Sequence, residues 1–250
     1  MKENIKKNFS RGAKNYNELA HPQEASARKL VWLAADLIKN DMQILDLGSG
    51  TSFIAKELCK NFPAQKLKIT EVDIAPQMLE SWTNRPQNVS TICCDMENLP
   101  FAKNSFDIIF SSFALHWLID FEKNFAQFSS LLKKDGHLVF CIPTDGSLDE
   151  LKAGELFEFH EFPKNSAIQS ALQNCSTKEV SFSCEPIPQS FPDVLSALKF
   201  IKKIGGNSSK SKKIITKSEL AHFNKFCLKN SGSDKSFAIS WNISYFIYQI

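Results

Sequence analysis

Between residues 42 and 141, short apolar runs alternate with longer amphipathic stretches. The runs have the length of strands, and the stretches repeat apolar residues three and four apart, as helices do. Strand and helix repeated in this order predict a parallel sheet covered by helices on both faces. The expected strands are 43–47, 67–73, 89–94, 106–112 and 136–141, and the expected helices are 53–61, 75–84 and 121–132.

The pattern changes after residue 143. Helices are expected at 148–160, 166–173, 193–203 and 218–228, with strands at 178–184 and 237–248, the last largely buried on one face. We predict one α/β domain over 1–250, with a seven-stranded, mostly parallel sheet whose last strand is antiparallel. An N-terminal cap (1–40) precedes a ligand-binding core (41–145), and a helical lid (187–236) is inserted before the last strand.

Composition limits the function classes. Thirty basic against 27 acidic residues give a net charge of +3, too small to indicate a nucleic-acid or membrane binder. No apolar run approaches the roughly 20 residues that span a bilayer, and the N-terminus lacks the apolar core of a signal peptide. The seven cysteines are odd in number and form no C-x-x-C pair, so neither a disulfide framework nor a zinc site is expected. We expect a cytoplasmic protein without a metal.

A glycine loop follows the first core strand, in the sequence I-L-D-L-G-S-G-T-S of residues 44–52. Open parallel sheets bind ligands beyond the carboxyl ends of their strands, which places this loop beside a ligand. Gly48 and Gly50 allow the backbone to approach that ligand closely. Phe53 stands where a dinucleotide-binding loop needs its third glycine, and no phosphate-binding lysine follows. The loop therefore favours a ligand without a phosphate.

The D-x-G-x-G form resembles motif I of class I S-adenosylmethionine-dependent methyltransferases. That resemblance implies a Rossmann-like fold in which Asp73 accepts from the ribose hydroxyls, Asp95 accepts from the adenine amino group and Met96 lies beside the ring. Ser52 stands where the family usually has a third glycine. The cofactor site implied in this way consists of Asp46, Gly48, Ser49, Gly50, Asp73, Ile74, Met78, Asp95, Met96 and Ser111.

Segments outside the core extend the resemblance. Residues 9–16 followed by His21-Pro-Gln23, and residues 111–117, are similar to the malonyl-acyl-carrier-protein O-methyltransferases of biotin synthesis. Further matches lie at 146–151, 195–205 and 215–220. The resemblance implies methyl transfer from S-adenosylmethionine to the free carboxylate of a malonyl thioester. A carboxylate is already ionised at pH 7, so no general base is required.

Three residues are candidates for the acceptor side. Arg11 is suited to a bidentate pair with the carboxylate, or is a surface arginine. Tyr16 would close the pocket over the methionine end of the cofactor, or is a packed aromatic. His116 follows the fourth core strand, where the family usually has glutamine, and would face the acceptor unless its role is structural.

A basic stretch from 194 to 218 holds seven lysines and no acid. Acyl-carrier proteins are strongly acidic, so we predict a docking surface here, although a solvated helix and loop would show the same pattern. RNA is disfavoured because the stretch has a single aromatic, Phe200. The docking candidates are Lys199, Lys202, Lys203, Lys210, Lys212 and Lys213.

Two other functions stay open. One is methylation of a small acceptor, such as a quinone precursor or a free acid, which would need no docking surface. The other is a non-catalytic assembly protein on the same fold, a reading that rests on the departure at Ser52. A dehydrogenase is disfavoured by Phe53.

Overall fold

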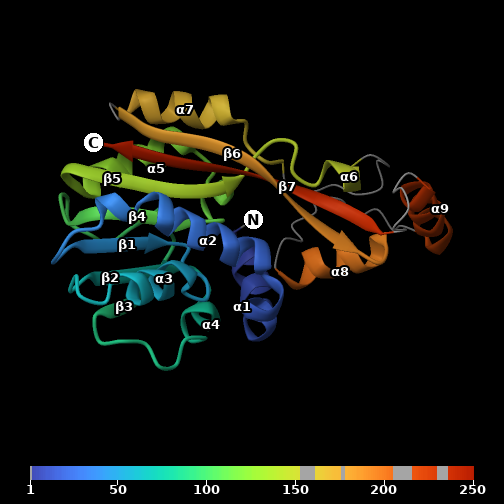
Figure 1. The fold of residues 1–250 in the computed structure, drawn as a ribbon, viewed down its shortest axis with the longest axis horizontal. Coiled ribbons are helices and arrows are strands. Elements are labelled where there is room, and N and C mark those ends of the chain that lie inside the picture. Colours follow the sequence, from blue (N-terminus) through green and yellow to red (C-terminus); the bar gives the residue numbers. More distant parts are fainter. Residues whose placement is uncertain (1, 153–160, 176–177, 205–215, 230–235) are drawn as a thin grey trace.

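A computed structural model describes residues 2–152, 161–175, 178–204, 216–229 and 236–250. Its centre is a seven-stranded sheet in the order β3-β2-β1-β4-β5-β7-β6. Neighbouring strands pair in parallel from β3 to β5, and β7 pairs antiparallel with both β5 and β6. The predicted α/β class, with a mostly parallel sheet and an antiparallel last strand, is therefore confirmed (Figure 1).

The strands are β1 (Gln43–Leu47), β2 (Lys68–Asp73), β3 (Val89–Cys93), β4 (Phe106–Ser112), β5 (Leu132–Pro143), β6 (Lys178–Phe191) and β7 (Phe237–Gln249). The helices are α1 (Lys2–Leu19), α2 (His21–Leu33), α3 (Phe53–Asn61), α4 (Pro76–Leu79), α5 (Phe121–Leu131), α6 (Asp149–Lys152), α7 (Asn165–Asn174), α8 (Val194–Lys203) and α9 (Lys217–Lys229), with short 3₁₀ turns η1 (Ala35–Leu37) and η2 (Leu115–Trp117).

The alternation of side chains along each strand builds two apolar cores, one on each face of the sheet. In β1, Ile44 joins the core under α2 and α3, whereas Leu45 and Leu47 join the core under α5 and α7. Asp46 has the parity of Ile44, so its carboxyl lies on the α2 side of the sheet. This places an acid at the carboxyl end of a buried central strand.

The terminal strand β7 lies between β5 and β6, and its second half is buried on both faces of the sheet. Tyr245 and Ile247 pack into the core on the α2 side, while Phe246 and Tyr248 pack into the core beneath α7. The prediction of one buried face is therefore wrong for this half. Phe246 and Tyr248, which break the polar alternation, fill the second core.

Other expected elements differ in length or are described only in part. The helix expected at 75–84 is α4, which ends at Leu79 because Arg85 donates to the Leu79 carbonyl (2.6 Å) and the Ser81 hydroxyl to the Met78 carbonyl (2.7 Å). The strand expected at 178–184 is β6, which continues to Phe191, so residues 187–191 of the expected lid belong to the sheet. The helix expected at 148–160 is described only as α6, since 153–160 lie outside the described residues.

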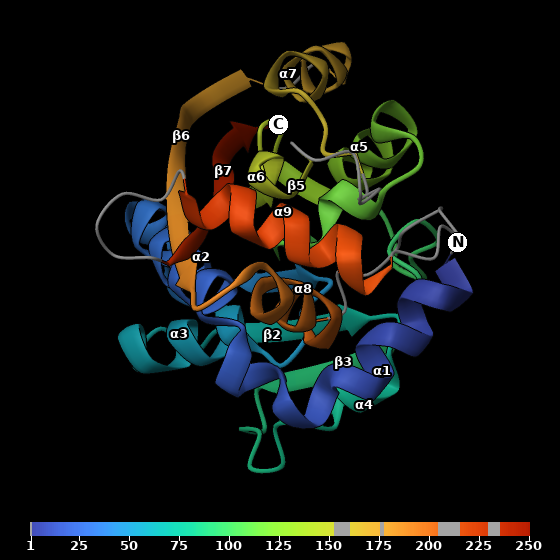
Figure 2. The same cartoon turned by 90° about the vertical axis from the view of Figure 1, so that its right-hand side faces the viewer.

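Helices α1, α8 and α9 gather beyond the end of the sheet toward which β1 points (Figure 1), and α1 and α8 cross in front of the strands when that end is viewed directly (Figure 2). Gly12 allows α1 to approach α8, because a Cβ there would lie 2.7 Å from the Lys203 carbonyl oxygen. The Val194 amide donates to Asn224 Oδ1 (3.0 Å), which joins α8 to α9. These helices cover the carboxyl ends of the parallel strands. In the described parts of the chain, no helix combines the length and apolar character needed to cross a bilayer.

Candidate functional site

A cleft of about 700 Å³ opens where the chain connections from the sheet diverge, at the carboxyl ends of β1 and β4. This switch point is where open α/β sheets hold ligands. Its walls come from the segments at and after the ends of β1, β2, β3 and β4, and from α1. The predicted residues that line it are Tyr16, Gly48, Gly50, Asp73, Ile74, Met78, Asp95 and Met96.

The glycine loop needs both glycines. Gly48 has φ +65°, and a Cβ at this position would lie 2.2 Å from the Ala114 Cβ. Gly50 has φ +54° and donates its amide to Asp73 Oδ2 (2.9 Å). The close approach of Gly48 to the segment after β4 sets the width of the cleft at this point.

Asp73 ties the end of β2 to the loop. Its Oδ1 accepts from the Ala75 amide (2.8 Å), while Oδ2 accepts from Gly50, so it orders the start of α4 as well as the cleft wall. Burial raises the pKa of Asp73 to about 6, although the amides of Ala75 and Gly50 oppose this by stabilising the charge. The carboxylate is therefore ionised at pH 7 and lines the cleft.

A smaller cavity adjoins the loop on its α2 side, with Tyr16 and Ser112 in its walls. Four of its lining side chains carry a buried oxygen that has no hydrogen-bond partner among the described residues: Gln23 Oε1, Asp46 Oδ2, Ser49 Oγ and Thr51 Oγ1. Burial, then the nearby Glu71 and Asp73, raises the pKa of the Asp46 carboxyl well above its ordinary value. Buried polar atoms without partners are costly, so this cluster indicates a cavity built for a polar ligand group.

The opposite end of the cleft is closed by the first turn of α1. Lys2 Nζ lies 2.6 Å from Asp95 Oδ2 and 2.9 Å from Glu97 Oε1, and Ile5 also lines the cleft. Met96 lies in the same wall. Asp95, which the resemblance assigned to the adenine amino group, thus lines this end of the cleft. Its carboxylate forms an ion pair with Lys2 of α1.

Ser111 does not line the cleft. It is fully buried, and its hydroxyl donates to the Leu47 carbonyl (2.8 Å) across the sheet. The next residue, Ser112, lines both the cleft and the small cavity instead. Successive strand residues point to opposite faces, so one position along the strand decides which serine meets the ligand.

Ser52 is accommodated away from the cleft. It adopts the left-handed conformation, with φ +73°, which explains why glycine is usual there. Its hydroxyl lies 3.5 Å from Arg85 Nη2, and Arg85 also donates from Nε to the buried Glu71 (2.9 Å). Burial raises the pKa of Glu71 and the Arg85 charge opposes the rise. The Ser52 side chain therefore does not line the cleft or the smaller cavity.

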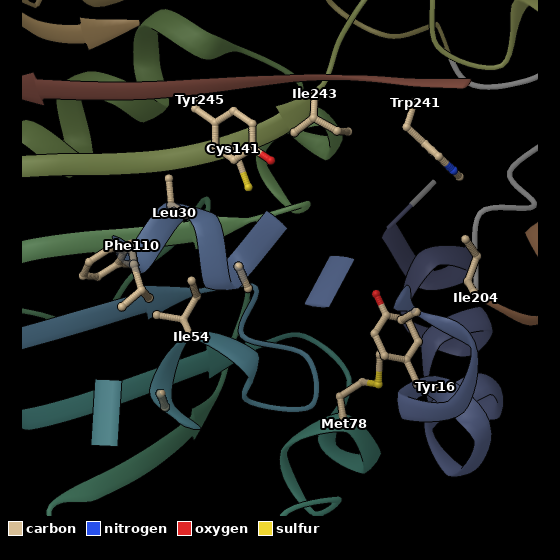
Figure 3. Close-up of a cluster of buried hydrophobic side chains, with 14 of the residues drawn as sticks. Tyr16, Leu30, Ile54, Met78, Phe110, Cys141, Ile204, Trp241, Ile243 and Tyr245 are labelled. Atoms are coloured by element: carbon tan, nitrogen blue, oxygen red, sulfur yellow. The ribbon is translucent and has the colours of Figure 1, made fainter. Parts of the chain in front are cut away.

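A second cavity, of about 500 Å³, lies between α1, α8 and the end of β7. It shares Phe9, Tyr16, Phe113 and Trp117 with the cleft, so the two spaces meet at these rings. Figure 3 shows Tyr16 on α1 with Met78 beneath its ring and Trp241 and Ile204 across from it. Burial, followed by the charge of Asp73, raises the pKa of Tyr16, which keeps its hydroxyl neutral.

Of the other candidates for the acceptor side, His116 lines this second cavity and Arg11 does not. His116 is buried, with its ring centroid 4.7 Å from that of Trp117. Arg11 is exposed and lines a surface groove between α1 and α8, together with Lys199, Lys202 and Lys203. Phe9 and Tyr16 face inward at a spacing of seven, and a helix turns Arg11 about 200° from Phe9. Lys210, Lys212 and Lys213 lie outside the described residues.

The sequence-based interpretation missed several lining residues. Gln23 belongs to a quoted motif but had no role assigned, and Thr51 lies inside the glycine loop. Trp241 lies within the strand expected at 237–248, and it also lines the second cavity. Its signal in the sequence is weak, because a tryptophan in an apolar strand is typical of any core.

Comparison with known proteins now fixes the family. A family described as a methyltransferase domain matches residues 45–140. A malonyl-[acyl-carrier protein] O-methyltransferase 1 of Ilyobacter polytropus is 30% identical over 221 residues, which cover 85% of this chain and 81% of that protein. This chain belongs to the malonyl-[acyl-carrier protein] O-methyltransferase family. The protein of that name from Geobacter sulfurreducens is 28% identical over 82% of both chains.

Solved structures agree on the fold of this family member, a class I S-adenosylmethionine-dependent methyltransferase. A candidate methyltransferase from Bacillus halodurans superposes with a TM-score of 0.65 at 16% identity, covering 90% of this chain and 98% of that one. A phosphoethanolamine N-methyltransferase 2 of Haemonchus contortus, solved with S-adenosyl-L-methionine, gives a TM-score of 0.55 at 17% identity, covering 88% and 52%.

Proposed function

We propose that the protein transfers a methyl group from S-adenosylmethionine to the free carboxylate of a malonyl thioester on acyl-carrier protein, early in biotin synthesis. The observation that carries this proposal is the junction at Tyr16. There a cleft with polar groups suited to the cofactor meets a second, largely apolar cavity able to receive an acyl group. Membership of the family supports the same reaction.

The residues of the cleft fit S-adenosylmethionine. Asp73 would accept from the ribose hydroxyls, and Asp95 would accept from the adenine amino group once Lys2 releases it. The oxygens without partners in the small cavity match the charged amino and carboxylate groups at the methionine end. When bound, the cofactor supplies a methyl group on a positively charged sulfur.

The protein's own contribution is positioning and exclusion of water. The acceptor carboxylate is ionised at pH 7, so no residue has to remove a proton. Methyl transfer brings the attacking oxygen to within about 3–3.5 Å of the carbon, in line with the bond that breaks. The reaction joins opposite charges, and an apolar cavity favours their loss over a hydrated ground state. Tyr16 would seal the junction and His116 would contact the acyl group.

The groove between α1 and α8 suits the carrier protein. The groove is lined by Arg11, Lys199, Lys202 and Lys203. On the inner side of the same α8 segment, Ile201 and Ile204 line the second cavity, which would hold the acyl group and is hereafter called the acceptor cavity. A short acyl chain on a flexible arm would then reach the cavity from a carrier held at these cations. We place the reaction in the cytoplasm, where the six described cysteines, all free, would remain reduced.

Methyl transfer from labelled S-adenosylmethionine tests the proposal, with malonyl-carrier protein, malonyl-coenzyme A and free malonate compared as acceptors. We expect kcat/KM to be highest for the carrier form and lowest for free malonate. Equal use of free acids or quinone precursors would favour the small-molecule alternative. Cofactor binding without transfer to any acceptor would favour a non-catalytic assembly role.

A further inference from the structure

The acceptor cavity has to hold a carboxylate without a cation. Among the described residues, no lysine or arginine lines it, and Arg11 lies on the far side of α1. The lining polar groups besides His116 are the Tyr16 hydroxyl, the Gln23 amide and the indole N–H groups of Trp117 and Trp241. A buried anion needs hydrogen-bond donors, so its position depends on where these neutral groups point.

The indole N–H of Trp241 is a buried donor that is available to a ligand in this cavity. The residue is 4% exposed, and its Nε1 has no hydrogen-bond partner within the described parts of the chain. Figure 3 shows its indole extending from β7, with the nitrogen at the end far from the strand and on the side where Tyr16 and Ile204 lie. A buried indole N–H normally finds an acceptor, so one supplied by a ligand is the expected partner.

The indole is held in this orientation by two phenylalanines. Phe113 meets it edge to face, with ring centroids 6.0 Å apart and planes at 64°. Phe162 makes a similar contact at 6.3 Å and 69°. Both rings also line the cavity, so they fix the indole without occupying its N–H. A donor fixed before the ligand arrives loses little entropy on binding.

We propose that Trp241 Nε1–H donates to the acceptor carboxylate, binding one oxygen and leaving the other to attack the methyl group. This inference rests on the proposed function and names the positioning residue of its acceptor site. In the step, the attacking oxygen forms the bond to the methyl carbon as the sulfur–carbon bond breaks. The bond's electron pair goes to sulfur, so the anion and the sulfonium both become neutral.

A neutral donor suits this reaction better than lysine or arginine. A cation would bind the carboxylate most strongly before its charge is lost, and interactions stronger in the ground state raise the barrier. The N–H bond to the remaining oxygen persists in the ester, whose carbonyl still accepts. An acyl group without a free carboxylate would leave the indole N–H unpaired, so the same residue selects malonyl over acetyl groups.

The test replaces Trp241 in two ways, as Trp241→Phe and with the isostere β-(3-benzothienyl)alanine, which keeps the ring shape and removes the N–H. Trp32→Phe is the control, because Trp32 is 71% exposed. We measure kcat/KM for malonyl-carrier protein, the inhibition constant of acetyl-carrier protein, the cofactor Kd and Tm. For both Trp241 variants we expect kcat/KM for the malonyl form to fall about tenfold or more. For the isostere, the inhibition constant of acetyl-carrier protein should stay unchanged or fall, and the cofactor Kd and Tm should stay close to wild type.

Two results would overturn the inference while the proposed function stands. One is an isostere with the wild-type kcat/KM for the malonyl form. The other is an equal loss for malonyl and acetyl carriers, which would assign Trp241 to packing alone. If the wild-type protein transfers no methyl group to a malonyl thioester, the proposed function fails and this inference fails with it.

Discussion

At the scale of single residues, Asp73 predicts how cofactor binding depends on pH. Its pKa is about 6 in the folded protein, raised mainly by burial. Ribose hydroxyls donate to the ionised carboxylate, so cofactor affinity should be constant above pH 7 and fall toward tenfold per pH unit below about 6. Titration calorimetry with S-adenosylhomocysteine between pH 5 and 8 measures this.

The control for that prediction is Asp73→Asn, which should bind more weakly at pH 7.5 and lose the dependence near pH 6. A variant that keeps the pH dependence would assign the titration to Asp46.

The contribution of Asp73 to folding stability changes with pH in the opposite direction to its contribution to cofactor binding. Because the folded pKa lies above the ordinary 3.8, the neutral carboxyl stabilises the protein below about pH 4, and that stability is lost as pH rises through 6.

Residue patterns predicted most of the cleft lining, but of the second cavity they predicted only Tyr16 and His116. Gly48, Gly50 and Asp73 stand in a local order that the chain must keep, so their positions could be predicted. The partner that accommodates Ser52 is Arg85, 33 residues away, and no local pattern connects them. Trp241 meets the cavity only because β7 inserts beside β5, a long-range pairing.

At the scale of elements, the contact between α1 and α8 makes Gly12 a sensitive position. Glycine to alanine inside a helix normally gains up to about 1 kcal/mol. Here the new Cβ would lie 2.7 Å from the Lys203 carbonyl oxygen, which is backbone and cannot turn away. We expect Gly12→Ala to destabilise the protein by about 1–3 kcal/mol and to raise KM for the acceptor.

Urea unfolding measures this change, with Ser10→Ala on the same helix as the control, because that residue is absent from the α1–α8 groove. The control should be neutral or slightly stabilising. A stabilised Gly12→Ala would mean that propensity outweighs the close contact and that α1 moves freely away from α8.

Core elements could be predicted from periodicity, whereas their ends depended on distant partners. The helix α3 was expected at its observed bounds, 53–61, because its apolar spacing is complete within the segment. The strand β6 runs beyond its expected end because β7 provides a partner as far as the pair Phe191 and Phe237. Pro186 and Pro188 argued against a strand this long in the sequence. The structure tolerates both prolines because β6 lies at the edge of the sheet.

At the scale of the whole molecule, the small net charge of the chain conceals a positive electrostatic field at the groove between α1 and α8. The chain carries only +3, yet Arg11 and the three lysines of α8 converge on one groove from segments nearly 190 positions apart. Only folding brings them together. A focused positive groove raises the association rate with an acidic partner and does so most at low ionic strength.

The charge reversal of Lys199, Lys202 and Lys203 to glutamate tests this field. We expect KM for malonyl-carrier protein to rise about tenfold or more at low salt and the difference to shrink at 0.5 M salt, since exposed charges are screened. Malonyl-pantetheine, which lacks both phosphate and carrier, should keep its KM. The matched control reverses the exposed Lys39, Lys60 and Lys68, which lie away from the groove. Equal effects of both triple variants would mean that total charge, and not the groove between α1 and α8, attracts the carrier.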